Sequence, residues 1–410
     1  MILQNCKING KLDAKPSKSI FQRLLALSFL AESPTIIQNP SFCDDSISVL
    51  NILNTLGCQI IQLENKIQII PNILDEDFIL NCNESALAIR MFSSILSLFD
   101  HNYTLIASKT LQKRKLFEIE TILGQLGALV RTNAGYPPIQ VKGPIKPGIV
   151  NLNAYHTSQF LTGLLIALPK LEGTSQIILT NISSKPYVDI TIDLVSKFGG
   201  NIKLIDSYCY ICNHSHYFGS EFYCENDWSN AAVFLTAGAI GGKCEISGLS
   251  INSMQGDKII LDVLAQVGAK IKVDDNSIIV EKSDLKPFEF AAKNYPDLVP
   301  ILSVLALNCE GKSKIYDVDR LKYKEINRLE KIINIFKQNN LKINYANNCL
   351  EITGSNYSFD YIDTDGDHRF AMAAAIISIN NPKPIKIINH KAITKSYPEF
   401  FEDFQKIQDC

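Results

Sequence analysis

The stretch LAQVGAKI (residues 264–271) has four counterparts, and their regular spacing decides the fold: LNTLGCQI (53–60), LGQLGALV (123–130), VSKFGGNI (195–202) and FKQNNLKI (336–343). Each counterpart has a helix-like end, a central small or polar residue, and then a β-rich run. The central residues are Gly57, Gly127, Gly199, Gly268 and Asn340, at spacings of 70, 72, 69 and 72. Glycine and asparagine tolerate the left-handed conformation that ends many helices. We therefore expect these five residues to end helices.

A period this regular indicates repeated folding units. A strand–turn–strand pattern follows four of the central residues, as in residues 59–70 and 270–281. A sixth repeat would reach Cys410, the last residue; residues 398–407 look like a helix with no strand after it, and the chain begins with strand-like residues 2–8. We infer that the two termini jointly complete a sixth unit. The alternative is a generic α/β protein with six unrelated helix–hairpin segments.

The expected fold class is therefore α/β, with two domains of three repeated units. One domain is continuous (15–226), and the other is assembled from both ends of the chain (1–14 and 227–410). A length of 410 residues also favours two domains.

Composition excludes several classes of function. The 40 Lys and Arg residues nearly balance the 42 Asp and Glu residues, so nothing global indicates a nucleic-acid or membrane partner. An anionic substrate would need a local cluster of basic side chains. No apolar run is long enough for a membrane span, and the N-terminus lacks the layout of a signal peptide. We expect a cytoplasmic protein.

The 11 cysteines are scattered and odd in number, which suits a reducing compartment. One group could bind zinc: Cys209, Cys212, His214, His216 and Cys224. However, residues 207–218 resemble a strand pair, and no second Cys-x-x-Cys follows to supply four ligands. We expect ordinary cysteines and no metal.

Basic side chains lie beside small hydroxylated ones at several separated points. The first is KPSKSIFQR (15–23), where Pro16 and Ser17 predict a helix start. A lysine and a serine at a helix N-terminus can bind an anion, although such pairs are common. The other points are Arg90, Arg114, residues 157–159, 184–187, Asp297, residues 324–328, 367–369 and Lys395.

Each point has a structural alternative when it is taken alone. Arg90 and Arg114 could be solvated helix charges. Residues 324–328 could form a surface ion-pair set on one helix face. Asp367 could simply cap the apolar helix that follows it.

The set taken in order resembles the 5-enolpyruvylshikimate-3-phosphate (EPSP) synthase family. The motifs that carry this resemblance span the chain: SKS with a following Arg (17–23), SQFLTGLL (158–165), SKPYVDIT (184–191), QGD (255–257), KEINR (324–328), GDHRFAMA (366–373) and KSYPEFF (395–401). The resemblance implies two domains of three βαβαββ units, each an inside-out α/β barrel. It also implies an active site in the cleft between the domains.

The resemblance further implies transfer of the enolpyruvyl group of phosphoenolpyruvate to the 5-hydroxyl of shikimate 3-phosphate, with release of phosphate. This reaction belongs to the shikimate pathway of aromatic amino-acid biosynthesis. By position, the residues that hold shikimate 3-phosphate are Lys18, Ser19, Arg23, Thr157, Ser158, Gln159, Ser184, Tyr187, Asp297 and Lys324. Those around phosphoenolpyruvate are Lys18, Arg90, Arg114, Gln159, Arg328, Arg369 and Lys395.

An addition–elimination reaction needs an acid, a base and stabilisation of charge. The resemblance assigns removal of the hydroxyl proton to Asp297 and protonation of C3 to Glu325, with Lys18 as an alternative or shared proton carrier. It implies no metal or organic cofactor. We expect a monomer whose partners are the two small-molecule substrates.

Some positions depart from the family pattern. The family's Asn-Ala-Gly-Thr loop reads Glu84-Ser85-Ala86-Leu87, Asn327 replaces an aspartate, and Arg320 replaces an asparagine. In this family, glyphosate inhibits by filling the space of the shorter phosphoenolpyruvate. A methyl group on Ala86 should narrow that space and confer resistance.

Two other functions remain as alternatives. The related enolpyruvyl transferase that acts on UDP-N-acetylglucosamine usually has a Lys-Asn pair near the start and a loop cysteine. This chain has Lys18-Ser19, and its early cysteines lie elsewhere. A non-catalytic repeat protein that binds phosphorylated ligands would not need both Asp297 and Glu325.

Overall fold

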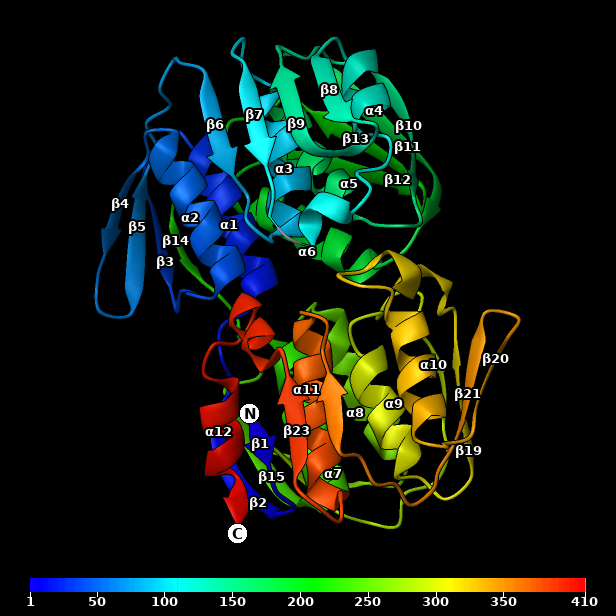
Figure 1. Cartoon of the computed structure of the whole chain (residues 1–410). Helices are drawn as coiled ribbons and strands as arrows, with labels where there is room; N and C mark the ends of the chain where they lie inside the picture. Colours follow the sequence, from blue (N-terminus) through cyan, green and yellow to red (C-terminus); the bar gives the residue numbers. More distant parts are fainter. Residues whose placement is uncertain (109, 410) are drawn as a thin grey trace. The chain divides into compact units, whose positions relative to one another are not determined.

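Two compact units make up the chain in the computed structural model, which describes residues 1–108 and 110–409 (Figure 1). The composite unit consists of Met1–Lys15 and Asn226–Cys410, and the continuous unit is Pro16–Glu225. Each unit has its own hydrophobic core. No helix in the described part of the chain combines the length and apolarity needed to cross a membrane.

One repeat in the continuous unit shows the pattern of all of them. Strand β6 (Phe78–Asn81) is followed by α3 (Ala86–Leu96), β7 (Tyr103–Ile106), α4 (Ile119–Gln125), β8 (Leu129–Asn133) and β9 (Tyr136–Lys142). The spatial order is β6-β7-β9-β8, with β6 and β7 parallel and the other pairs antiparallel. The predicted β-α-β-α-β-β unit is therefore confirmed.

The same arrangement recurs in the continuous unit's two other sheets. The first has the order β14-β3-β5-β4, with helices α1 and α2: β14 (Glu221–Tyr223), β3 (Thr35–Gln38), β5 (Lys66–Ile70), β4 (Gln59–Gln62), α1 (Lys18–Leu30) and α2 (Asp44–Thr55). The other has the order β10-β11-β13-β12, with α5 and α6: β10 (Ile149–Ala154), β11 (Thr174–Ile182), β13 (Cys209–Asn213), β12 (Asn201–Asp206), α5 (Gln159–Ala167) and α6 (Lys185–Lys197).

The composite unit contains three further sheets. The order β16-β17-β15-β2-β24 accompanies α7 and α8: β16 (Lys270–Val273), β17 (Ser277–Glu281), β15 (Gly242–Ser247), β2 (Lys7–Asp13), β24 (Gln408–Asp409), α7 (Trp228–Gly241) and α8 (Ile260–Gln266). The order β18-β19-β21-β20 accompanies α9 and α10: β18 (Glu289–Ala291), β19 (Lys312–Tyr316), β21 (Cys349–Thr353), β20 (Ile343–Ala346), α9 (Val299–Leu307) and α10 (Arg328–Gln338). The order β1-β23-β22 accompanies α11 and α12: β1 (Ile2–Leu3), β23 (Ile385–Ile388), β22 (Tyr361–Asp363), α11 (His368–Ile377) and α12 (Phe400–Lys406).

Both termini enter the sheets of the composite unit. Strand β1 pairs antiparallel with β23 in the last repeat. Strand β2 runs parallel to β15 and also pairs with β24. The expectation that no strand follows the last helix is wrong, because β24 extends the sheet of β2. The repeat position expected at Cys410 lies outside the described residues.

The five central residues of the repeats all have positive φ, as predicted. The values are +105° for Gly57, +104° for Gly127, +96° for Gly199, +84° for Gly268 and +57° for Asn340. This conformation turns the chain from the end of a half-exposed helix into the next strand.

Helices of two kinds alternate along the chain. Helices α1, α3, α5, α7, α9 and α11 are buried on nearly all sides, whereas α2, α4, α6, α8, α10 and α12 bury one side. A helix that is apolar all round belongs in a core. The strands alternate between buried and exposed residues, so the sheets flank the buried helices. The described strands form separate sheets of three to five strands rather than a closed barrel.

Candidate active site

Several of the predicted residues of the continuous unit lie at helix N-termini. Lys18 and Ser19 begin α1, Ser158 precedes α5, and Ser184 precedes α6. Free backbone N–H groups and the positive end of the helix dipole make such ends favourable for anions. We call this set the first group: Lys18, Ser19, Arg23, Arg90, Arg114, Thr157, Ser158, Gln159, Ser184 and Tyr187.

Arg23 connects three of these helices while it is buried. Its Nε donates to Thr191 Oγ1 at 2.8 Å, and its Nη2 donates to Thr162 Oγ1 and Tyr187 O, each at 3.2 Å. Its Nη1 donates to Ser19 O at 2.7 Å. Burial lowers the pKa of Arg23 to about 10. Since all four acceptors are neutral, they orient the guanidinium without cancelling its charge.

Arg90 lies in the second turn of α3 and is also buried, so its interpretation as a solvated helix charge is wrong. Its Nη1 donates to Gln159 Oε1 at 2.9 Å, and its Nη2 donates to Lys115 O at 2.9 Å. Helices α3 and α5 approach closely because α5 carries Gly163. A Cβ atom there would lie 2.8 Å from a backbone oxygen of α3. This close packing brings Arg90 and Gln159 together.

Lys18 forms an ion pair that the sequence analysis missed. Its Nζ lies 3.0 Å from Asp45 Oδ2, and Asp45 is a buried residue in the first turn of α2. Two consecutive acidic residues at the start of this helix were the available signal. In this structure Asp45 therefore offsets the charge of a predicted catalytic lysine.

The remaining members of the first group belong to the segments before α4, α5 and α6. Thr157 Oγ1 accepts a hydrogen bond from Gln159 N at 3.2 Å. Ser184 is buried and has φ of +52°, a strained conformation for a residue with a Cβ. Arg114 is half-buried and follows a short 3-10 helix (Leu111–Lys113), so it is not a helix charge either.

Within the composite unit the second group is Asp297, Lys324, Glu325, Arg328, Arg369 and Lys395. Arg328, the first residue of α10, is buried and donates to three carboxylates at 2.7 Å: Asp297 Oδ1, Glu325 Oε2 and Asp367 Oδ2. Lys324 Nζ lies 3.3 Å from Asp297 Oδ1. The alternative of a surface ion-pair set on one helix face is wrong, because α10 begins only at Arg328.

Asp367 has two roles in this group. It caps α11 by accepting a hydrogen bond from Arg369 N at 2.8 Å, and it also holds Arg328. The cap prediction is confirmed but incomplete. Lys395, at the end of a 3-10 helix (His390–Lys395), lies with its Nζ 3.9 Å from Glu325 Oε1. The structure thus brings the predicted residues of two repeats together.

Comparison with known proteins identifies the family. The family model for EPSP synthase (3-phosphoshikimate 1-carboxyvinyltransferase) matches residues 3–404. The chain belongs to the EPSP synthase family. It is 33% identical to a 3-phosphoshikimate 1-carboxyvinyltransferase of Clostridium novyi over 98% of this chain and 95% of the relative. A relative with the same name from Buchnera aphidicola subsp. Schizaphis graminum is also 33% identical, over 98% and 96%.

Solved structures show the same fold as this EPSP synthase family member. An EPSP synthase from Acinetobacter baumannii has a TM-score of 0.83 at 21% identity, covering 99% of this chain and 97% of that chain. The enolpyruvyl transferase NikO from Streptomyces tendae has a TM-score of 0.78 at 15% identity, covering 100% and 97%.

Burial and neighbouring charges shift the pKa values of Asp297 and Lys324 in the second group. Burial of Asp297 would raise the pKa of its carboxyl, but Lys324, Arg328 and Arg369 together hold that pKa well below its usual range. Burial is the main cause that lowers the pKa of Lys324 to about 8, and the cations Arg320 and Arg328 lower it further, while Asp297 opposes them. Asp297 is therefore ionised at neutral pH, and Lys324 can lose its proton in mildly alkaline solution.

Arg320, which stands where the family pattern has an asparagine, adds a positive charge near Lys324. Arg320 is buried, and its Nη1 donates to Lys293 O at 2.5 Å. Asn327, another departure, caps α10 by accepting a hydrogen bond from Glu330 N at 3.2 Å. The family's aspartate is therefore replaced here by a residue that can still cap the helix.

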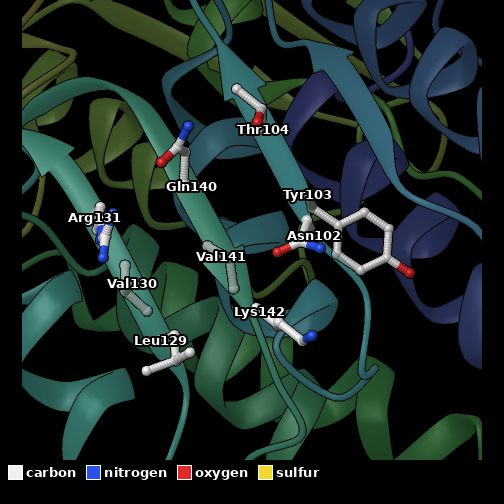
Figure 2. Close-up of a pocket in the computed structure, with 9 residues that line it drawn as sticks. All are labelled: Asn102, Tyr103, Thr104, Leu129, Val130, Arg131, Gln140, Val141 and Lys142. Atoms are coloured by element: carbon white, nitrogen blue, oxygen red, sulfur yellow. The ribbon is translucent and has the colours of Figure 1, made fainter.

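A hollow lies at the sheet β6-β7-β9-β8 of this EPSP synthase family member (Figure 2). It has a volume of about 350 Å³ and is lined by residues of three neighbouring strands, β7, β9 and β8, with Asn102 before β7. None of the predicted site residues lines it.

The cysteines do not form a metal centre in the described part of the chain. Cys209, Cys212 and Cys224 are buried, and Cys209 and Cys212 lie in β13, as the strand-pair interpretation predicted. No group of three or more His, Cys, Asp or Glu side chains among residues 1–108 and 110–409 is placed to hold a metal ion.

Proposed function

We propose that this protein transfers the enolpyruvyl group of phosphoenolpyruvate to the 5-hydroxyl of shikimate 3-phosphate and releases phosphate. One observation carries the proposal: each unit contains a buried arginine that donates hydrogen bonds to neutral acceptors. Arg23 has such acceptors in the first group. Arg369 has them in the second group, which also contains Asp297 and Glu325.

Both substrates are dense anions, so binding them side by side requires positive charge that is not already cancelled. Burying a charge is costly, and binding of an anionic ligand beside a buried guanidinium offsets part of that cost. Arg23 and the hydroxyl groups of Ser158 and Ser184 would hold shikimate 3-phosphate, together with Lys324. The planar guanidinium groups of Arg90 and the other arginines would bind the carboxylate and phosphate of phosphoenolpyruvate.

The substrate-binding residues proposed from the family pattern complete these two sets. For shikimate 3-phosphate they are Lys18, Ser19, Arg23, Thr157, Ser158, Gln159, Ser184, Tyr187, Asp297 and Lys324. For phosphoenolpyruvate they are Lys18, Arg90, Arg114, Gln159, Arg328, Arg369 and Lys395. The proposal includes joint binding by both groups and action as a monomer in the cytoplasm.

The proposed reaction has two balanced steps. In the first, the 5-hydroxyl oxygen attacks C2 of phosphoenolpyruvate, its proton passes to Asp297, and C3 gains a proton from Glu325. In the second, C3 returns a proton to Glu325, the double bond re-forms, and phosphate leaves C2 with the proton that Asp297 had accepted. Lys18 is placed by the family pattern to share proton transfer and to stabilise the charge of the intermediate.

Ligand binding would adjust Asp297 for this role. Without ligand, the surrounding cations hold its pKa too low for an effective base. Bound anions would draw those cations into new contacts, and the pKa of Asp297 would then rise. The same exchange would release the guanidinium of Arg328 from part of its carboxylate partners.

A phosphate-release assay tests the proposal. The enzyme is supplied with phosphoenolpyruvate and either shikimate 3-phosphate or UDP-N-acetylglucosamine, in parallel. We expect release only with shikimate 3-phosphate, and the same reaction should yield its enolpyruvyl ether by mass spectrometry. Release with the nucleotide sugar alone would favour the related transferase, and release with neither would leave a binding protein.

A further inference from the structure

Asn230 contacts Arg369 of the second group and lies outside the motifs of the family pattern. It is in the first turn of α7, and its backbone N donates to the capping residue Asp227 at 2.8 Å. The residue is 2% exposed. Helix α7 packs against α11, the helix that carries Arg369 (Figure 1). Asn230 is therefore held rigidly beside the proposed donor site.

The amide of Asn230 binds two separate segments. Its Oδ1 accepts a hydrogen bond from Arg369 Nη1 at 3.2 Å. Its Nδ2 donates to Ser396 O at 3.4 Å, next to Lys395 in the chain. One side chain thus contacts one proposed phosphoenolpyruvate ligand directly and holds the backbone beside another.

The contacts of Arg369 differ in kind from those of Arg328. Arg328 donates to three carboxylates. Arg369 Nη1 donates instead to Asn230 Oδ1 and to the backbone oxygen of Ser229, both neutral. Arg369 Nε is buried and has no hydrogen-bond partner within the described part of the chain. A neutral acceptor orients the guanidinium and leaves its charge available to an anion.

We propose that Asn230 is a positioning residue that orients Arg369 and the backbone beside Lys395 for phosphoenolpyruvate, and that its neutral amide adds no carboxylate to the guanidinium of Arg369. This inference rests on the proposed function, because it assumes that both cations bind the donor substrate. Amide chemistry is essential to it: asparagine accepts from the arginine and donates to the carbonyl, whereas aspartate can only accept.

Asn230→Asp is the decisive variant because it preserves shape and changes charge. The carboxylate would pair with Arg369 and would face Ser396 O without a proton to donate. We expect KM for phosphoenolpyruvate to rise about tenfold or more, the scale of one charge-assisted contact. KM for shikimate 3-phosphate should stay within about twofold, since its proposed ligands are untouched.

Asn230→Ala distinguishes the effect of an added negative charge from the effect of lost hydrogen bonds and packing. It removes both hydrogen bonds and leaves a small cavity, but it adds no negative charge, and Arg369 keeps Ser229 O. We expect a smaller rise in KM for phosphoenolpyruvate, about threefold, from loss of one neutral contact. A purely structural role predicts the reverse order, with alanine more harmful than the isosteric aspartate.

Asn381→Asp is the matched control. Asn381 is another fully buried asparagine of the composite unit, whose side chain bonds Phe359 and Lys383 backbone groups outside the proposed site. It should lower the melting temperature and leave both KM values unchanged.

The outcomes are distinct. Wild-type enzyme without phosphate release would remove the proposed function, and this inference with it. Active wild type with Asn230→Asp no worse than Asn230→Ala for phosphoenolpyruvate would overturn this inference alone. An equal rise in both KM values would also overturn it, and if the aspartate variant fails to fold, an unchanged KM for phosphoenolpyruvate in Asn230→Ala would do so.

Discussion

Replacing Lys324 by arginine should abolish the alkaline limb of the pH profile of kcat/KM for shikimate 3-phosphate. In the wild-type enzyme, burial lowers the pKa of Lys324 from 10.5 to about 8, despite the carboxylate of Asp297 3.3 Å from its Nζ. The protonated form, which can bind a phosphate, therefore predominates below pH 8 and is lost as pH rises through it. An arginine stays charged throughout this range.

The size of the effect follows from the titration. A difference between 10.5 and about 8 corresponds to ~3 kcal/mol against the charged form. Above pH 8, kcat/KM should fall about tenfold for each pH unit, if one proton controls binding. Bound phosphate would stabilise the charged lysine, so kcat at saturating substrate should decline only at higher pH. Because kcat/KM reports the free enzyme and kcat the complex, the two limbs should separate.

Asp297→Asn provides an independent check with a definite sign. Asp297 raises the pKa of Lys324, so removing its charge should move the alkaline limb of kcat/KM to lower pH. We expect a shift of about one pH unit or more for an ion pair at this distance.

The assay is initial-rate phosphate release between pH 6.5 and 10, at saturating phosphoenolpyruvate and constant ionic strength. Constant ionic strength matters because salt screens charged contacts. Lys324→Arg should have a lower kcat/KM than wild type at pH 7, since a guanidinium group differs in shape from an ammonium group. Its pH profile of kcat/KM should nevertheless be flat above pH 8. The same alkaline limb in wild type and Lys324→Arg would refute the assignment of this titration to Lys324.

Four further outcomes are expected. Lys18→Met should abolish turnover without unfolding the protein. Lys170→Met is its matched control, because the Lys170 side chain is 19% exposed and paired with Glu32, while that of Lys18 is 16% exposed and paired with Asp45. Near-normal turnover in Lys18→Met would exclude Lys18 from the site. Asp297→Asn and Glu325→Gln should each lower kcat by about 10²-fold or more, and an unchanged kcat would assign that carboxylate to positioning. Shikimate 3-phosphate should reduce the radius of gyration in small-angle scattering if both groups bind it, whereas an identical radius at saturation would contradict joint binding. Glyphosate should inhibit Ala86→Gly more strongly than wild type, by about 10–200-fold for a methyl-sized difference; strong inhibition of wild type with no gain in the glycine variant would show that the methyl lies outside the donor pocket.

Local features of the chain were predictable because their causes are local. Gly57 and Asn340 mark helix ends through a backbone preference that each residue carries by itself. The cap at Asp367 and the helix start after Ser17 have the same origin. The strand after the last helix was missed, since a segment as short as β24 has no periodic pattern and exists only because β2 lies beside it.

In the candidate site, too, features with local causes were predictable and contacts between distant segments were not. Residue types and their order indicated which cations to consider, and the structure placed those of the composite unit together. The pairing of Lys18 with Asp45 and the burial of Arg90 were not predicted, because a charged residue in an isolated helix pattern is more often solvated.

By itself, the sequence determined the repeat, the helix ends and the set of charged residues, because these depend on neighbours within a few positions. Only the tertiary structure decided which acceptor each cation meets. Arg328 is surrounded by carboxylates, including one 39 residues away, whereas Arg369 meets the amide of Asn230 at a separation of 139 residues. These contacts arise from packing of helices from different repeats, so they cannot be predicted from the spacing of residues along the chain.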